Sequence, residues 1–307
     1  MDFTDVSLVA LRVFREVAER GTFTAAATAL GYTQSAVSRQ IASLERAAGA
    51  PLLERRREGV LLTAAGQVVL RNAAGVLDQL DATARELAGL PAAGGTVRLG
   101  WFPSAGAVLL PQAISALRRG HPAITVTTRE GSTPALVRAL RAGTVDLALL
   151  ASAPPFRPPD AESPALRLET LAERSLRLAV PASHPLAAHD SVDVADLRGQ
   201  RWIAGPAAGE ELLMGVWPGL DERPVIAHTV RDWLAKLQLV AAGAGLTTIS
   251  ASMASAAPAG VRVVTVRGGP KELRRTILAR LPGRLSEPAA LLADALRAAA
   301  LDVNPRG

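Results

Sequence analysis

Four hydrogen-bonding side chains near the amino end have the types and spacing needed for recognition chemistry: Gln34, Ser35, Ser38 and Arg39. Positions four residues apart lie on one face of a helix, so all four would project from the first two turns of one helix. Glutamine can bond adenine through two hydrogen bonds, arginine can bond guanine or grip a phosphate, and serine can serve either. The set therefore indicates reading of base edges in a DNA groove.

The helices that would position these side chains are predicted from their caps. Thr33 suits the N-cap of a helix over residues 34–47. An alanine-rich helix precedes it, with Thr22 or Thr24 as its cap, and ends at Leu30.

The turn between the two helices has a recognisable spacing. Ala27, Gly31 and Val37 fall at positions i, i+4 and i+10, which lets two helices cross closely around a glycine. The pattern predicts a helix-turn-helix, whose second helix meets the major groove with its N-terminal part. An ordinary helical hairpin with solvated polar residues is the alternative.

A basic hairpin is predicted next, over LLERRREGVLLT at residues 52–63. Arg55, Arg56 and Arg57 cluster at its centre, where they could lie on the phosphate backbone or enter the minor groove. A solvated surface turn is the other interpretation. Thr63 could cap the long helix that follows.

That long helix is predicted over residues 64–88, which contain no proline. A 4-3-4-3-4 spacing of mostly apolar residues forms a heptad seam, which favours pairing with a second chain. The alternative is a helix that lies on its own domain. The seam residues are Val69, Ala73, Val76, Leu80, Thr83 and Leu87. PAAGG, at residues 91–95, reads as a linker.

From residue 96 onward the pattern is α/β. Short β-branched strands alternate with helices, which predicts a parallel sheet with right-handed crossovers. A second series of strands and helices follows, and the chain closes with a strand and a helix. Ligands in such folds bind at the carboxyl ends of strands or between two halves.

Composition bounds the possible functions. Without cysteine the chain has no disulfide, thiolate catalysis or cysteine-based zinc site, and its four histidines lack metal-ligand spacing. No apolar run approaches about 18 residues, and the N-terminus lacks a basic signal-peptide region, so we expect a cytoplasmic protein. The net charge of +6 lies entirely beyond residue 90, so DNA binding by the amino-terminal part would need local clustering of charge.

The sequence resembles the LysR-type transcriptional regulators along essentially its whole length. The resemblance is carried by VAERGTFTAAATALGYTQSAVSRQIASLE and LLERRREGVLLTAAG. Later segments that match are EGSTPALVRALRAGTVDLAL, HPLAAHDSVDVADLRGQRWI and LVAAGAGLTTI.

The resemblance implies an α+β multidomain fold. A winged helix-turn-helix would occupy residues 1–63, a linker and dimerisation helix 64–90, and an effector-binding domain 94–307. That domain would hold two Rossmann-like subdomains, similar to a type 2 periplasmic binding protein. Subdomain I would span about 94–166 and 268–307, and subdomain II about 167–267.

The resemblance also implies partners: operator DNA, a small effector between the subdomains, a second chain, a homotetramer of dimers, and RNA polymerase. No cofactor or metal is expected. Effector binding would shift the equilibrium between two arrangements of the dimer on DNA.

Position at strand ends selects candidate effector residues. Hydroxyls at helix N-termini favour a carboxylate or similar anion, and aromatic residues could supply apolar walls. Helix capping or core packing is the alternative for each residue. The candidates are Ser104, Ser132, Thr133, Trp101, Phe102, Trp202, Ile203, Gly205, Trp233, Thr247 and Thr248.

Other functions were weighed. An enzyme is disfavoured because GWFPSAG has Phe102 where a nucleophile elbow needs glycine, and no P-loop or dinucleotide fingerprint occurs. A free solute-binding protein does not account for the first 90 residues. A regulator whose effector cleft no longer binds ligand stays open.

Overall fold

We analysed the chain as a computed structural model. It describes residue 3 and residues 6–56, 59–87, 95–205, 214–269 and 272–302. Arg57, residues 91–94 of the predicted linker and the side chain of Leu87 lie outside this description.

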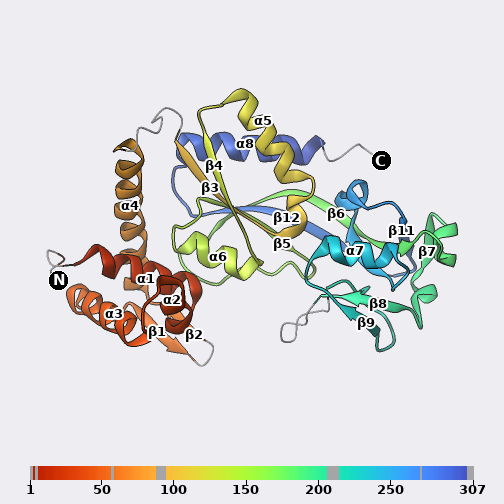
Figure 1. Ribbon diagram of the computed structural model, residues 1–307, viewed down its shortest axis with the longest axis horizontal. Coiled ribbons are helices and arrows are strands. Elements are labelled where there is room, and N and C mark those ends of the chain that lie inside the picture. The colour runs from red at the N-terminus through yellow and green to blue at the C-terminus, as the bar shows by residue number, and fades with distance from the viewer. Residues whose placement is uncertain are drawn as a thin grey trace.

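The amino-terminal part is a winged helix-turn-helix (Figure 1). Its elements are α1 (Leu8–Arg20), α2 (Phe23–Leu30), α3 (Gln34–Ala48), β1 (Leu53–Arg56) and β2 (Gly59–Leu62). The two strands pair antiparallel as the wing.

Local signals define the helix ends. The hydroxyl of Thr22 accepts a hydrogen bond from the Ala25 amide at 3.1 Å, so Thr22 rather than Thr24 is the cap of α2. Gly31 ends α2 with φ 67° and ψ 28°, a left-handed conformation that glycine adopts without strain. The tight turn that this permits sets the angle between α2 and α3.

The wing is fastened to the recognition helix by one side chain. The Glu45 carboxylate accepts hydrogen bonds from the amides of Leu52 and Leu53, at 2.8 and 3.3 Å. The second strand of the wing is also bonded to the domain, because the Val60 amide donates to the backbone oxygen of Gly21 at 2.8 Å. The wing and α3 therefore form one rigid unit.

Helix α4 (Ala64–Leu87) leads away from the winged domain. Thr63 caps it as predicted, because its hydroxyl accepts from the Gly66 amide at 3.0 Å. Leu70, Ala73 and Leu77 on one side of α4 are buried, whereas the opposite side is exposed.

The carboxyl-terminal part is built on an eight-stranded mixed sheet with strand order β4-β3-β5-β12-β6-β11-β7, in which β10 also pairs with β6. Its first half follows the predicted pattern, since β3 pairs in parallel with both β4 and β5. The elements of this half are β3 (Thr96–Trp101), a 3₁₀ turn (Pro103–Gly106), α5 (Leu109–Gly120), β4 (Thr125–Glu130), α6 (Thr133–Arg141), β5 (Leu147–Ser152), β12 (Leu273–Arg280) and α8 (Glu287–Asp302).

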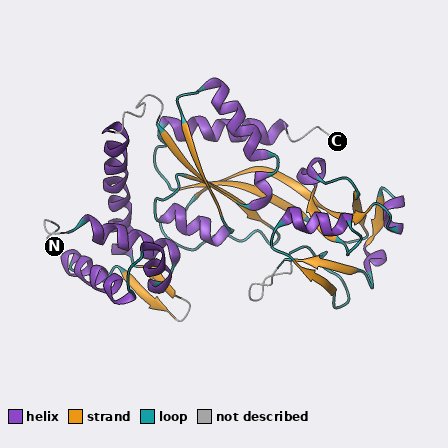
Figure 2. Cartoon of the chain, in the orientation of Figure 1, coloured by secondary structure: helices purple, strands orange, loops and turns teal. Residues whose placement is uncertain are grey.

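Helices cover both faces of this half of the sheet (Figures 1 and 2). Helices α5 and α8 lie on one face and α6 lies on the other. Leu147 and Leu149 of β5 pack under α5 and α8, whereas Ala148 and Leu150 pack under α6. The apolar run in β5 is buried because both of its faces are covered.

Strand β6 (Arg167–Pro181) joins the two halves. It pairs with β12 over residues 167–175 and with β10 and β11 over residues 176–181.

The second half carries a small parallel sheet of its own, β8 with β9. The elements are β7 (Ser191–Asp193), β8 (Arg201–Ala204), β9 (Val225–Thr229), α7 (Trp233–Ala241), β10 (Thr247–Ser250), β11 (Val261–Arg267) and 3₁₀ turns at Pro185–Ala188, Val194–Leu197 and Ala251–Ala256. In the described ranges, no helix is both long and apolar enough to cross a membrane.

Candidate DNA-binding surface and effector site

Helix α3 presents the predicted polar face. Gln34, Ser35 and Arg39 are exposed and Ser38 is half-buried. The opposite face, formed by Val37, Ile41 and Leu44, is buried in the core of the winged domain. The polar side chains therefore point away from the protein, on the part of α3 that can enter a groove.

Two residues before α3 complete this surface. The Thr33 hydroxyl accepts from the Ala36 amide at 3.2 Å and lies 3.0 Å from the Ser35 hydroxyl, so it is engaged in capping. Tyr32, which the sequence analysis did not select, is 46% exposed beside the turn. A polar aromatic residue between a turn glycine and an N-cap was the signal that could have revealed it.

The arginines of the wing are already partly engaged. The Arg55 guanidinium lies 4.9 Å from the ring centroid of Phe23 in a cation–π contact. Arg56 pairs with Glu54 at 3.0 Å, and both side chains are exposed. Contact with a phosphate would therefore compete with an exposed ion pair, which costs little to break.

The heptad seam on α4 divides into two parts. Ala73 is buried within its own chain, so its side chain offers no surface to a second chain, contrary to prediction. Val69 is half-buried against the core of the winged domain, and its pairing with a second chain stays a prediction. Val76 and Leu80 are 47% and 37% exposed. They line a groove together with Arg71, Asn72, Gly75 and Gln79.

In the first half of the effector domain, the predicted hydroxyls gather at the carboxyl ends of neighbouring strands. Ser132 is the N-cap residue of α6, but its hydroxyl makes no cap bond and is exposed. The Thr133 hydroxyl donates to the oxygen of Ala151 at 3.1 Å, which ties α6 to the end of β5. Ser104, half-buried after β3, lies in the adjoining loop, and the Gly131 amide donates to the oxygen of Trp101 at 3.0 Å.

The two aromatic residues at the end of β3 serve packing. Trp101 and Phe102 are half-buried against the cluster beneath α5 and α8. A side chain at Gly106 would collide with the Trp101 indole, with 2.3 Å between its Cβ and the ring. The indole therefore lies directly on the 3₁₀ turn that carries Ser104.

In the second half, three predicted contacts are core residues. Trp202 and Ile203 are fully buried because both faces of β8 are covered. Thr247 is also buried, and its hydroxyl donates to the oxygens of Ile203 and Gly215 at 2.8 and 3.2 Å. These three side chains stabilise the half-domain instead of facing a ligand.

Two of the other predicted residues of this half, Thr248 and Trp233, are half-buried. Gly205, the residue after β8, is buried. Near them lies Lys236 of α7, a residue that the sequence analysis missed. The rarity of lysine could have drawn attention to it, because the chain contains 32 arginines and only two lysines.

The winged domain and the effector domain meet along α1, α4 and α6 (Figure 1). Arg138 of α6 donates from Nε to the backbone oxygen of Glu19 at 3.1 Å, and Arg129 forms an ion pair with the Glu19 carboxylate. Ala142, just after α6, is buried in the core cluster of the winged domain. No sequence pattern predicted this junction.

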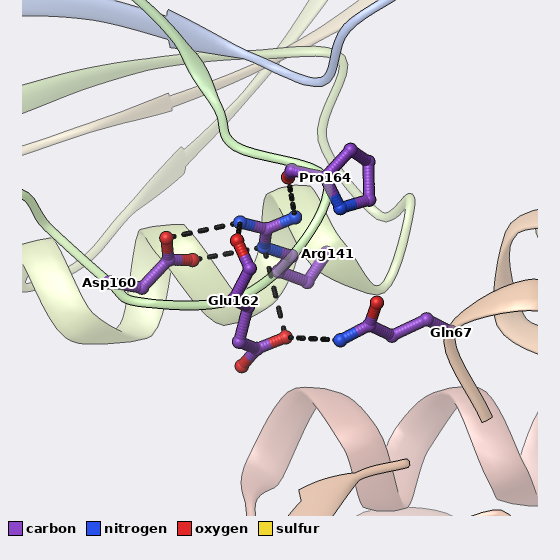
Figure 3. A network of polar contacts seen from close by, with 5 residues as sticks. All are labelled: Gln67, Arg141, Asp160, Glu162 and Pro164. Carbon is purple, nitrogen blue, oxygen red and sulfur yellow. Dashed lines mark hydrogen bonds and ion pairs between the residues drawn. The ribbon is translucent and has the colours of Figure 1, made fainter. Parts of the chain in front are cut away.

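A polar network continues the junction to α4 (Figure 3). Arg141 is buried and holds Asp160 in two hydrogen bonds of 2.9 and 3.0 Å, as well as the oxygen of Pro164 at 2.6 Å. The Glu162 carboxylate lies 3.8 Å from Nε of Arg141. It also accepts a hydrogen bond of 3.5 Å from the side-chain amide of Gln67 in α4. Burial raises the pKa of Glu162, against the opposing attraction of Arg141.

Within the described ranges, no three or more histidine, aspartate or glutamate side chains form a group that could hold a metal ion.

Two family models match the chain. Residues 8–67 match the model described as bacterial regulatory helix-turn-helix protein, lysR family, and residues 92–301 match the LysR substrate binding domain. Together the two models cover the winged domain and nearly all of the effector domain.

The proteins and solved structures that are similar to this chain agree with the two family models. The chain is 31% identical over 254 residues to YnfL, an uncharacterized HTH-type transcriptional regulator of Escherichia coli (strain K12). These residues make up 81% of this chain and 83% of that protein. It is 36% identical over 181 residues to a probable hydrogen peroxide-inducible genes activator of Mycobacterium xenopi, covering 59% of this chain and 92% of that one.

Full-length BenM is similar with a TM-score of 0.55, at 26% identity and over 98% of this chain and 100% of that one. CbnR has a TM-score of 0.53 at 25% identity, over 94% and 99% of the two chains, and it has also been solved with its target DNA. The chain therefore belongs to the LysR family of transcriptional regulators.

Proposed function

We propose that this regulator binds a specific operator through the N-terminal end of α3 and that a small carboxylate or similar metabolite alters this binding. The observation that carries the proposal is the exposed row Gln34, Ser35 and Arg39 on a helix locked by a left-handed glycine and a threonine cap. CbnR, which is similar in fold, binds its target DNA. We assign residues 1–63, 64–90 and 94–307 to DNA binding, linking and effector binding.

A homodimer through α4 is part of the proposal. Val76 and Leu80 leave an apolar strip on the exposed side of the helix, with heptad spacing. A second copy of this helix supplies the complementary strip, because identical seams pair in a two-fold dimer. Association of dimers into a tetramer, and contact with RNA polymerase, extend the same proposal.

The effector would bind at the strand ends of the two halves. Ser104 and Ser132 supply hydroxyls from the first half, and Gly205 and Thr248 contribute from the second. Ala107, directly after the turn that carries Ser104, packs against the core of the second half, so the two sets approach one another there. A ligand seated between them would change how the halves lie together.

Helix α6 offers a route from this site to the DNA-binding part. Ser132 and Thr133 stand at its N-terminal end, and Arg138 and Arg141 at its other end enter the junction with the winged domain. A nine-residue helix is short and stiff, so a shift at one end moves the other. Coupling needs an effector with different affinity for the two arrangements.

The test is a gel-shift titration of the full chain with DNA from upstream of its own gene, at several salt concentrations. We expect a specific complex whose affinity falls as salt rises. A metabolite screen by thermal shift on the full chain follows, since a ligand at a hundredfold excess over Kd stabilises by about 2.7 kcal/mol. No specific complex would refute DNA reading, and a screen without a hit would favour a regulator that does not respond to ligand.

A further inference from the structure

Lys236 is a half-buried ammonium group near the end of β8. It stands in the second turn of α7, and its side chain reaches back toward Gly205 and Gly215. A Cβ built on Gly215 would lie 3.0 Å from Lys236 Nζ, and one built on Gly205 would lie 3.9 Å away. The absence of a side chain at Gly215 leaves room for the ammonium group.

No described residue forms a hydrogen bond or ion pair with the ammonium group of Lys236. The neighbouring acid on this helix, Asp232, is occupied at the N-cap of α7, where it accepts from the Ala235 amide at 2.6 Å. The Thr247 hydroxyl nearby donates to two backbone oxygens. Burial lowers the pKa of the Lys236 ammonium group.

Other deeply placed cations of the chain are treated differently. Arg141, which is buried, is bonded to the carboxylate of Asp160 and to two backbone oxygens. A buried charge normally has such partners, because removing it from water costs several kcal/mol. A partly buried cation next to strand ends, with no ion-pair partner among the described residues, is therefore the kind of group that can bind an anionic ligand.

We propose that Lys236 Nζ binds the carboxylate of the effector, beside Gly205 and Gly215. This inference rests on the proposed effector function and adds to it the charged contact. An ammonium group on a flexible stem suits a carboxylate as a point charge, whereas the arginines used elsewhere in the chain make planar, two-point contacts. The ligand carboxylate would supply a counter-charge that no described residue provides.

Amine labelling of the full chain tests this. The chain has only two lysines, so mass spectrometry after acetylation follows Lys236 with Lys271 as the internal control. Sodium acetate, succinate and benzoate serve as probes against sodium chloride at equal ionic strength. We expect at least one carboxylate to slow labelling of Lys236 by about threefold or more without altering Lys271.

A thermal-unfolding measurement provides the second arm. Lys236→Met removes a half-buried charge that no described residue pairs, so we expect its Tm without carboxylate to exceed that of the wild type by about 2–4 °C. Gln238→Met, at an exposed position of α7, is the matched control. A lower Tm for Lys236→Met relative to that control would show that the lysine is structural and would overturn the proposal.

The outcomes separate the two proposals. If a carboxylate raises the Tm of the chain but leaves Lys236 labelling unchanged, the effector function stands and the Lys236 assignment fails. If no carboxylate changes either readout, the assignment to a carboxylate effector fails together with the Lys236 contact. DNA binding by the wild-type chain is scored independently of both results.

Discussion

Gln67 and Glu162, 95 positions apart in the sequence, are joined by a hydrogen bond of 3.5 Å between the linker helix and the effector domain (Figure 3). Glu162 belongs to the loop that Arg141 organises at the C-terminal end of α6. The bond therefore connects α4, which carries the DNA-binding domain, to the helix whose other end holds Ser132 and Thr133.

The stability of this junction should depend on pH through Glu162. Its folded-state pKa is raised, so the protonated carboxyl is favoured in the folded chain. The resulting stabilisation is full below about pH 4.5 and is lost as the pH rises through the raised pKa. Arg141, Asp160 and Gln67 are the groups that face it.

Glu162→Gln cannot ionise and escapes this loss. We expect the unfolding free energy of Glu162→Gln, measured in urea from pH 4 to 8, to increase relative to that of the wild type as the pH rises through the raised pKa of Glu162. Above that pKa the difference between the two proteins should become constant. Glu130→Gln, at an exposed position of the same domain, is the control. Parallel curves for wild type and Glu162→Gln would contradict the assignment.

A second prediction concerns Glu19, which is only 6% exposed and pairs with Arg129 across the junction. Glu19→Gln removes the negative charge but leaves a polar side chain of similar size. Since Arg129 can return to water, we expect a loss of about 1–3 kcal/mol in unfolding free energy. Glu16→Gln, which breaks only the pair with Arg20 inside α1, should cost about 0.5 kcal/mol or less. Equal losses would show that the junction contributes nothing.

A third prediction uses DNA as the ligand. Coupling between two sites is reciprocal, so DNA binding should alter α6 if α6 carries the effector signal. We expect amide hydrogen exchange of residues 133–141 in the full chain to change on addition of operator DNA. Arg138→Ala removes the bond to Glu19 and should reduce that change at least twofold, whereas Arg118→Ala on the exposed side of α5 should not. If Arg138→Ala shows the same DNA-dependent change in hydrogen exchange as the wild type, the proposed coupling through α6 is wrong.

Much of the DNA-binding domain could be predicted because its signals are local. The caps at Thr22, Thr33 and Thr63 act within three residues, and Gly31 needs only its own left-handed conformation. The polar face of α3 follows from helical periodicity alone.

The junction between the domains could not be predicted. Arg138 and Glu19 are separated by 119 positions, and no periodic pattern relates α6 to α1. The strand ends of the second half were predicted, but not which side chains are exposed there. Trp202 and Ile203 are both buried since β8 is covered on both faces, a fact set by distant packing.

A fourth prediction tests base reading. Gln34→Ala and Arg39→Ala should each weaken specific operator binding by about 1–3 kcal/mol in a gel-shift titration. Arg56→Ala should weaken binding to all sequences and lower the salt slope by about one. Arg46→Ala, at the exposed C-terminal end of the same helix, is the control and should change specific binding least. Affinities equal to wild type for the Gln34 and Arg39 variants would remove these side chains from the interface.

The last prediction concerns the exposed side of α4. Leu80 projects from the helix beside Val76, and a carboxylate placed there would be buried opposite its own copy in a dimer. We therefore expect Leu80→Glu to raise the dimer dissociation constant by at least about tenfold, or 1.4 kcal/mol, in sedimentation velocity. Leu234→Glu introduces the same change at a comparably exposed leucine of α7, remote from α4, and should leave the dimer intact. Dissociation by both variants, or by neither, would mean that the second copy does not pair through this strip, because only a contact at Leu80 distinguishes the two substitutions.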